Sequence, residues 1–237
     1  MNVLKKIRSF LSDLFKYHNP LNNRRQKKLH DEVKNTNPSL IAGNCLGGML
    51  LHDLGLRFNS PTVNIHFYQR ELVKFVLDLD RYLNESLEFY DDPDSEWPVN
   101  ALLGGKDGIR LGFAHITLPK EGSRNWNKRK ERFNYDNIFV IAEEKEGMTK
   151  QDILSLGESK VKGIVVFTVH EYPEIPYTFC VPSKYVENGE VGNILKFKHI
   201  DASHIYDDFI DWPKWFNEAD GGDYDITPFI KKKYRKK

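Results

Sequence analysis

The sequence predicts an α/β fold, with a mostly parallel sheet covered by helices and one antiparallel hairpin element. From residue 38 onward, apolar runs with strand spacing alternate with runs that have helical spacing. The runs at 138–142 and 163–169 are apolar almost throughout, which is typical of strands buried on both faces. The segment "ALLGGKDGIRLGFAHITL" places Gly-Lys-Asp-Gly between two apolar arms, and this pattern favours a hairpin that turns near residues 105–108. We expect this hairpin to be an antiparallel element on the otherwise parallel sheet.

The first elements of the core follow in chain order. "SLIAG" is a short apolar run that predicts a strand, and the apolar spacing over residues 46–54 predicts a short helix closed by Gly55. "PTVNIHF" alternates apolar and polar residues as a strand does. "YQRELVKFVLDLDRYLNESL" has the spacing of one amphipathic helix. The first 50 core residues are therefore predicted as β-α-β-α.

The second half of the core continues the alternation. "SRNWNKRKERFNYDN" is compatible with a helix and is densely basic. "NIFVIAEE" and "KGIVVFTVHEY" predict two buried strands, and the helix "TKQDILSLGES" between them is predicted to be capped by Thr149 with Asp152 at its third position. "DWPKWFNEAD" predicts a helix near the end of the chain.

The charges divide the chain of 237 residues into a core domain with two basic ends. Residues 1–37 hold nine Lys and Arg against three Asp and Glu, and are predicted to form a basic amphipathic N-terminal helix and a linker. Residues 38–230, the predicted α/β core domain, hold 31 acidic and 20 basic side chains. Residues 231–237 form a lysine-rich tail.

The N-terminal helix is predicted from apolar residues at helical spacing within residues 1–18, with basic residues among them. Such a helix can lie on an anionic membrane surface or pack on its own domain, and both alternatives stay open. Neither basic end interleaves aromatic and basic residues regularly, so no nucleic acid partner is expected. We expect a cytoplasmic protein, since no signal peptide or membrane-spanning run is recognisable. Under the first alternative for the N-terminal helix, it would contact the inner face of the cell membrane peripherally.

Four polar clusters follow predicted strands. They are Asn44-Cys45, His66, Glu143-Glu144 and His170-Glu171. Ligands of open parallel sheets bind outside the carboxyl ends of the strands. We therefore expect these clusters to meet in one crevice.

Cys45 is the candidate nucleophile in this crevice. Its predicted place at a helix N-terminus would lower the pKa of its thiol, and the glycines at 43, 47 and 48 would let a ligand approach closely. His170 or His66 would serve as base, with Glu171 or Asp53 as orienting partner. The alternative is that Cys45 is a buried small residue, as most free cysteines are. With two cysteines in the chain, neither a disulfide framework nor a structural zinc site is expected.

The sequence also contains polar pairs and a histidine outside these four clusters. The pair His52-Asp53 is expected to be solvated, because adjacent helical residues do not face each other. His115 lies in a predicted strand and belongs either to the core or to a pocket. The Asp-x-Asp pairs at 78–80 and 223–225 are expected to be solvated acids, and no metal ligands are predicted.

The basic segment at 124–132 is a candidate anion site. Helical spacing brings Arg129 and Arg132 toward one face, with Trp126 nearby. Guanidinium groups suit phosphates or carboxylates, and an aromatic ring can stack on a base or a sugar. The alternative is a solvated basic face with Trp126 in the core.

Three blocks of the sequence resemble a bacterial family known as a domain of unknown function. They are "LIAGNCLGGMLLHDLGLRFNSPTVNI", "WNKRKERFNYDNIFVI" and "VVFTVHEYPEIPY", which run in the family's order and cover most of residues 38–217. The family's members are described as exopolysaccharide or capsule biosynthesis proteins, and some as acyl- or acetyltransferases. This chain departs from the family pattern at Gly43, where a polar residue is more common, and at Val169, where Lys is common. The resemblance implies an α/β fold and no settled catalytic residues.

Residues and resemblance together predict a transferase, acyl or glycosyl, that modifies a surface-polysaccharide precursor. The activated donor would be a coenzyme A ester or a sugar nucleotide, and the acceptor a glycan precursor. The predicted catalytic residues are Cys45, His170 and Glu171, and the predicted substrate- and donor-binding residues are Asn44, Gly47, Gly48, His66, Trp126, Arg129 and Arg132. The alternative is a non-catalytic module that binds a sugar nucleotide or a glycan within a polysaccharide assembly complex.

Overall fold

The computed structural model describes residues 19–196 and 199–235. The amphipathic helix predicted within residues 1–18, with its membrane contact, lies outside these residues. Within the described ranges, every helix is too short or too polar to cross a membrane.

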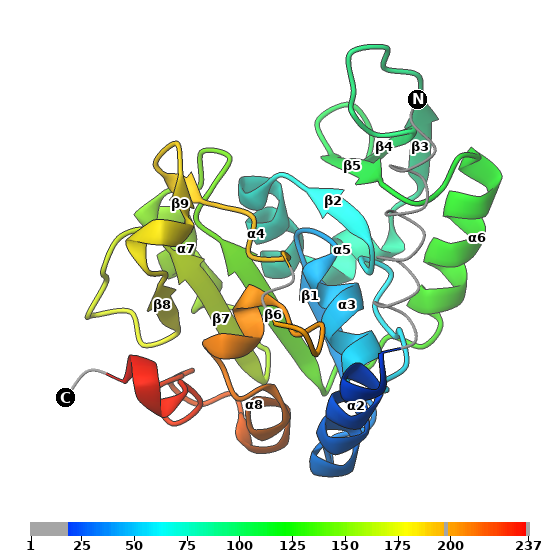
Figure 1. Ribbon diagram of the computed structural model, residues 1–237. Helices are drawn as coiled ribbons and strands as arrows, with labels where there is room; N and C mark the ends of the chain where they lie inside the picture. The colour runs from blue at the N-terminus through cyan, green and yellow to red at the C-terminus, as the bar shows by residue number, and fades with distance from the viewer. Residues whose placement is uncertain (1–18, 197–198, 236–237) are drawn as a thin grey trace, which may run out of the picture.

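A four-stranded parallel sheet forms the centre of the molecule (Figure 1). Its strands are β1 (Ser39–Ala42), β6 (Ile138–Glu143), β7 (Gly163–Thr168) and β8 (Thr178–Cys180), in the order β1-β6-β7-β8. Every residue of the first three strands is buried. The predicted α/β fold with a parallel sheet of buried strands is therefore confirmed.

A second four-stranded sheet is antiparallel. It contains β2 (Ile65–Phe67), β5 (Ile109–Phe113), β4 (Val99–Leu103) and β3 (Leu87–Tyr90), in the order β2-β5-β4-β3. The predicted hairpin is confirmed as the β4–β5 pair, because Leu103 pairs with Ile109 and the Gly108 N–H donates to the Gly105 carbonyl at 2.9 Å. Gly104 and Gly105 have φ angles of 87° and 76°, which favour glycine in this turn.

The prediction that this hairpin joins the parallel sheet is wrong, and β2 also belongs to the antiparallel sheet. The alternating burial of β2 suits an antiparallel sheet with one open face. The two sheets nevertheless meet where β1 and β2 end, because the Phe67 N–H donates to the Gly43 carbonyl at 2.9 Å.

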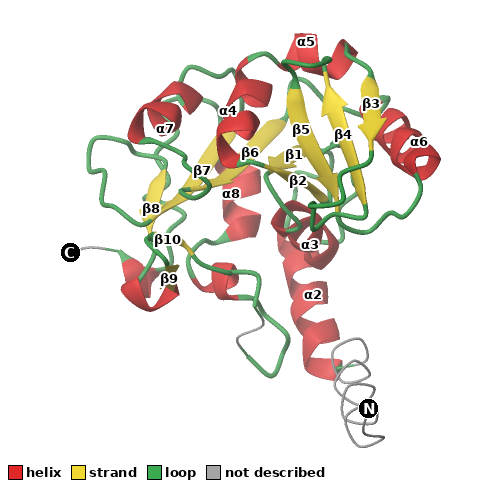
Figure 2. Ribbon diagram, turned by 90° about the horizontal axis from the view of Figure 1, so that it is seen from above, coloured by secondary structure: helices red, strands yellow, loops and turns green. Residues whose placement is uncertain are grey.

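Helices cover both sheets (Figures 1 and 2). They are α3 (Leu46–Asp53), α4 (Gln69–Leu77), α5 (Leu79–Asn84), α6 (Pro119–Lys130), α7 (Lys150–Leu156) and α8 (Trp212–Glu218). The single helix predicted between β2 and β3 is divided at Asp78, whose φ of −134° and ψ of 52° are not helical. The predicted cap of α7 is confirmed as a reciprocal capping box between Thr149 and Asp152.

Short elements complete the described chain. They are the hairpin of β9 (Val186–Glu187) and β10 (Glu190–Val191) and the 3-10 helices Ser183–Tyr185, Ile205–Asp208 and Lys232–Tyr234. The β9–β10 hairpin lies at the carboxyl end of β6, since the Val191 N–H donates to the Glu144 carbonyl at 3.1 Å.

Residues 20–32 of the predicted N-terminal region form helix α2 (Pro20–Glu32), which lies against α3 (Figure 2). Arg25 joins the two helices, because its Nη2 lies 2.6 Å from the Asp53 Oδ2. The expectation that His52-Asp53 is a solvated pair is wrong for Asp53, which is 5% exposed, while His52 is exposed. Adjacent helical residues point in different directions, and here α2 covers only one of the two.

Candidate functional site

The carboxyl ends of β1 and β6 are joined by polar side chains. The Asn44 Nδ2 donates to the Glu143 Oε2 at 2.8 Å, and Asn44 Oδ1 accepts the Leu46 N–H at 2.9 Å. Glu143 is 3% exposed and forms an ion pair with Lys145. Its backbone N–H donates to the Gln69 Oε1 at 2.9 Å. The predicted meeting of the clusters at Asn44 and Glu143 is thus present in the structure.

The glycines of the turn face protein atoms. A Cβ at Gly43 would overlap the amide of Gln69, and a Cβ at Gly48 would overlap the Asn64 side chain. A Cβ at Gly47 would lie 3.0 Å from the Ala42 Cβ. Gly47 and Gly48 are buried, so the structure gives them a role in packing α3 on its neighbours rather than in contacting a ligand.

Cys45 is the N-cap residue of α3, and its Sγ lies 3.3 Å from the His115 Nε2. Its side chain makes no capping hydrogen bond, because Asn44 provides that contact. Burial raises the pKa of the Cys45 thiol, which is opposite to the lowering expected at a helix N-terminus. The thiol is therefore protonated at neutral pH and needs a base to become a nucleophile.

Sequence reasoning did not select His115 as the partner of Cys45. Strand β5 ends at Phe113, so His115 lies in the following turn and is exposed. The signal available in the sequence was "FAHITLP", where the histidine precedes a proline-initiated helix. Its contact with Cys45 crosses 70 residues of chain and depends on the packing of β5 beside β2.

The contacts of His66 are with Trp97, Tyr68 and Glu146. Its ring stacks on Trp97 with centroids 4.7 Å apart, and its Nε2 lies 3.6 Å from the Glu146 Oε1. Burial, with the nearby charge of Lys145, lowers the pKa of His66 to about 4. Burial also raises the pKa of Glu146 to about 6. Near pH 7 the imidazole is therefore neutral.

His170 is oriented by Glu144, not by the predicted partner Glu171. The His170 Nδ1 lies 2.8 Å from the Glu144 Oε1, which also accepts the Tyr172 hydroxyl at 2.7 Å. The Glu144 Oε2 accepts the backbone N–H groups of Val169 at 2.6 Å and His170 at 3.2 Å. Burial acts to raise the pKa of Glu144, but these hydrogen bonds outweigh it and the pKa is lowered.

The predicted common crevice is therefore divided between two corners of one sheet edge. At the first corner, Cys45 follows β1 and contacts His115. At the second, His170 follows β7 and contacts Glu144. Strand β6 lies between β1 and β7, which separates the thiol from the second imidazole.

Each corner borders a cavity. The second corner adjoins a cavity of about 620 Å³ along β8, whose lining includes Val169, Glu171 and Tyr172. Near the first corner, a cavity of about 190 Å³ is lined by His115, Asn64 and Trp126. Trp126 is 2% exposed and packs in the core against Phe75.

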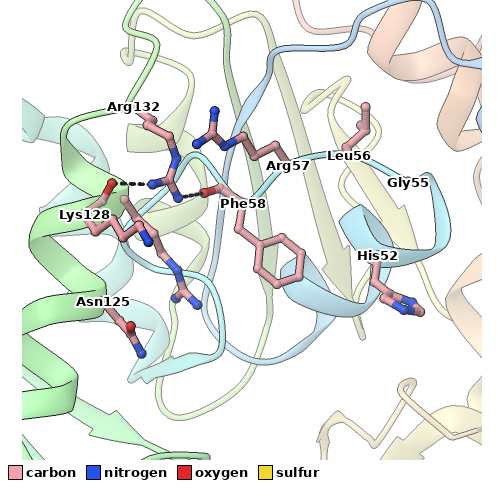
Figure 3. A pocket seen from close by; sticks show the side chains of 9 residues that line it. His52, Gly55, Leu56, Arg57, Phe58, Asn125, Lys128 and Arg132 are labelled. Atoms are coloured by element: carbon pink, nitrogen blue, oxygen red, sulfur yellow. Dashed lines mark hydrogen bonds between the residues drawn. The ribbon is translucent and has the colours of Figure 1, made fainter.

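A third cavity, of about 480 Å³, lies between α6 and the loop after α3 (Figure 3). We call it the basic pocket. It is lined by His52, Gly55, Leu56, Arg57, Phe58, Asn125, Lys128, Arg129 and Arg132. Arg129 and Asn125 also line the smaller cavity that contains His115, so the two cavities adjoin. The structure thus brings Arg129 and Arg132 to a shared pocket, as the helical spacing predicted.

Backbone carbonyls hold the two arginines in place. The Arg132 guanidinium donates to the Lys128 carbonyl at 2.6 Å and to the Phe58 carbonyl at 2.7 Å (Figure 3). The Arg129 Nη1 donates to the Val63 carbonyl at 2.7 Å. These bonds fix α6 against the loop, and among residues 19–196 and 199–235 neither guanidinium forms an ion pair with a carboxylate.

Asp53, His204 and Asp207 each offer one ligand atom within 4.8 Å of the others, a spacing that could hold a metal ion. Arg25 already occupies this cluster, since its guanidinium lies 2.6 Å from Asp53 and 3.4 Å from Asp207. The guanidinium supplies the positive charge that the two carboxylates need. We therefore interpret the cluster as a buried ion-pair network that anchors α2.

Comparison with known proteins places the chain in a family. A model described as "Domain of unknown function (DUF1919)" matches residues 16–217. An uncharacterized protein of Haemophilus influenzae (strain ATCC 51907 / DSM 11121 / KW20 / Rd) is 30% identical over 219 residues, which are 92% of this chain and 100% of that protein. The predicted membership in a family of unknown function is confirmed: the chain belongs to the DUF1919 family.

Proposed function

We propose that this protein is an acyltransferase that modifies a surface-polysaccharide precursor, with Cys45 as nucleophile and His115 as its base. The observation that carries the proposal is the 3.3 Å contact between the thiol and the imidazole, beside a cavity that adjoins the basic pocket. A nucleophile within hydrogen-bond reach of a base is the arrangement that covalent acyl transfer needs. The polysaccharide precursor is proposed from the sequence resemblance.

The raised pKa of Cys45 determines how the thiol would react. The His115 Nε2 takes the thiol proton as the sulfur attacks the acyl carbonyl of a coenzyme A ester. The bond from the carbonyl carbon to the coenzyme A sulfur breaks, and His115 returns the proton to that leaving thiolate. An acceptor hydroxyl then attacks the new thioester, its proton passes to His115, and the Cys45 sulfur leaves and recovers the proton. Atoms and electrons balance without a redox partner.

His170 supports a second assignment of the base. The Glu144 carboxylate holds the Nδ1 of His170, as the orienting carboxylate of a catalytic triad does. The His170 side chain is 68% exposed. In this version His170, with Glu171 beside it, would activate an acceptor hydroxyl bound at the second corner. Replacement of each histidine separates the two assignments, as described in the Discussion.

Trapping of the acyl-enzyme tests the proposal. After incubation of the full chain with acetyl coenzyme A or longer acyl esters and rapid denaturation, intact-mass spectrometry should find one acyl group that neutral hydroxylamine removes. Cys45→Ala should abolish this adduct. Cys180→Ala is the matched control, since Cys180 is also a half-exposed cysteine outside any disulfide, and it should retain the adduct. An adduct that persists in Cys45→Ala, or no adduct with any acyl ester, would contradict the proposal.

The alternative function is a non-catalytic module that binds a sugar nucleotide or a glycan. The protonated state of the Cys45 thiol favours it, because a thiol without an activated base is inert. This alternative predicts that ligand binding survives Cys45→Ala and His115→Ala together and that no donor is turned over.

A further inference from the structure

We propose that the basic pocket binds the diphosphate group of a nucleotide-containing donor, and that Arg57 and Lys128 are the side chains that hold it. This inference deepens the proposed function, because it names the chemistry of the donor. The binding itself requires no reaction at Cys45.

The first observation is an uncompensated positive charge. Arg57, Lys128, Arg129 and Arg132 all line the pocket. Across residues 19–196 and 199–235, no carboxylate lies within 4.0 Å of any of these four groups. Five of the seven other described arginines are paired with carboxylates at distances of 3.8 Å or less: Arg25, Arg70, Arg81, Arg110 and Arg124. The pocket thus concentrates cations whose counter-charge is not supplied by the described chain.

The second observation is the rigidity of the cationic wall. Arg129 and Arg132 use their guanidinium groups to bond backbone carbonyls, so they stay in the pocket wall without a ligand. Burial lowers the pKa of Arg129, and the charge of Arg132 lowers it further. A bound anion relieves this repulsion, whereas a neutral ligand does not.

The third observation is the distribution of the two exposed cations. Arg57 comes from the loop after α3 and Lys128 from α6, and Figure 3 shows both side chains at the pocket between these elements. No hydrogen bond or ion pair of either side chain is present among the described residues, so both can turn toward a ligand. A diphosphate presents two linked anionic groups, which can contact both elements at once. A single phosphate offers only one.

The fourth observation concerns the rest of the ligand. The pocket volume of about 480 Å³ is within the range of roughly 300–1,000 Å³ that ligand pockets occupy. Phe58 and His52 add rings to the wall, against which a nucleoside can pack. Arg129 and Asn125 connect the pocket to the cavity of His115, which gives the far end of the donor a path to Cys45.

Isothermal titration calorimetry of the full chain tests the site with ADP, UDP, pyrophosphate and AMP as probes. We expect ADP or UDP to bind at least about tenfold more tightly than AMP, and raised salt to weaken both. Coenzyme A and UDP-glucose are titrated separately, because acyl donors and sugar donors both contain a diphosphate group. The tighter of the two identifies the donor source.

Arg57→Gln and Lys128→Gln should each weaken diphosphate binding about tenfold. Arg124→Gln is the matched control, since Arg124 is exposed on the same helix and pairs with Glu121 outside the basic pocket. This control should stay within about twofold of the unchanged protein. Lys128→Arg, which keeps the charge, should restore most of the affinity, and equal melting temperatures show that the variants fold.

Two results would overturn the inference. One is the absence of binding by all four probes at millimolar concentration, and the other is equal affinity in the variants at 57 and 128 and in the control at 124. Cys45→Ala should bind the probes normally, so failure of the reaction proposal and failure of this site give different results. Diphosphate binding without an acyl adduct would keep the site and reject the chemistry.

Discussion

The pKa values of ionisable groups are set by different effects at the two corners of the sheet edge. At the Cys45 corner, burial dominates and raises the pKa of the thiol. Burial likewise lowers the pKa of His66, whose ring stacks on Trp97, to about 4. At the His170 corner, four hydrogen bonds to Glu144 outweigh burial and keep its carboxylate charged. Burial alone favours neutral groups, whereas donors aimed at an oxygen stabilise the ion.

This contrast gives the corners different chemical uses. A neutral thiol beside an exposed imidazole can react only when the imidazole takes its proton, so Cys45 depends on His115. A carboxylate that already holds an imidazole fixes the orientation of the ring and stabilises its charged form. The first corner is therefore suited to a nucleophile with a general base, and the second to a base held in one orientation by a carboxylate.

The largest expected effect comes from replacing each of the two candidate bases, His115 and His170, in turn. His115→Ala should slow formation of the acyl-enzyme by roughly 100- to 10,000-fold, because general-base catalysis contributes about that much. His170→Ala should change this step by less than about fivefold, since its ring contacts Glu144 rather than the thiol. Rapid-quench measurement of the adduct compares the two variants. A larger loss in His170→Ala would move the reaction centre to the second corner.

The next effect concerns stability at the His170 corner. Glu144→Gln removes the charge and turns an amide donor toward backbone N–H groups, so it should destabilise the protein by about 2–4 kcal/mol. Since the folded pKa of Glu144 is lowered, its stabilisation is present above the unfolded value of 4.5 and is lost as the pH falls through the folded pKa. Urea unfolding at pH 7 and pH 3 should therefore show that the unfolding free energies of the unchanged protein and Glu144→Gln differ less at pH 3 than at pH 7. Glu88→Gln, at an exposed position on β3, should stay within about 0.5 kcal/mol at both pH values.

The smallest effect tests burial at Glu146, which lies beside His66. Burial raises the pKa of Glu146 to about 6, above its ordinary value of 4.5. The ionised form therefore costs stability as the pH rises through 6, and no such cost is present below 4.5. Glu146→Gln should raise the unfolding free energy by about 1 kcal/mol at pH 7.5 and leave it unchanged near pH 4. A destabilised variant at pH 7.5 would show that the contacts of Glu146 with His66 and Gln69 outweigh its burial.

Most strands and helices were predictable because their signals are local. The buried runs of β6 and β7, the glycine turn between β4 and β5 and the capping box at Thr149 each depend on neighbouring residues. The break at Asp78 and the assignment of β2 to the antiparallel sheet were not predicted. Both depend on which element packs beside the segment, and spacing along the chain does not encode that choice.

The candidate site was predictable only in part. The rule for parallel strand ends correctly brought Asn44 to Glu143, because both follow neighbouring parallel strands. It could not pair Cys45 with His115, since the histidine belongs to the other sheet. It also grouped Glu144 with His170, because Glu144 follows β6, the strand beside β7, but Glu171 or Asp53 was expected to orient the base.

By itself, the sequence determined the α/β class, the order of the buried strands along the chain and the concentration of arginine and lysine on one helix. These properties follow from periodicity and composition, which act over a few turns of chain. Only the tertiary structure decided which imidazole meets the thiol, which carboxylate orients His170 and where the basic helix encloses a pocket. Those contacts join residues as distant as 74 positions, and they arise when two sheets and their covering helices exclude water together.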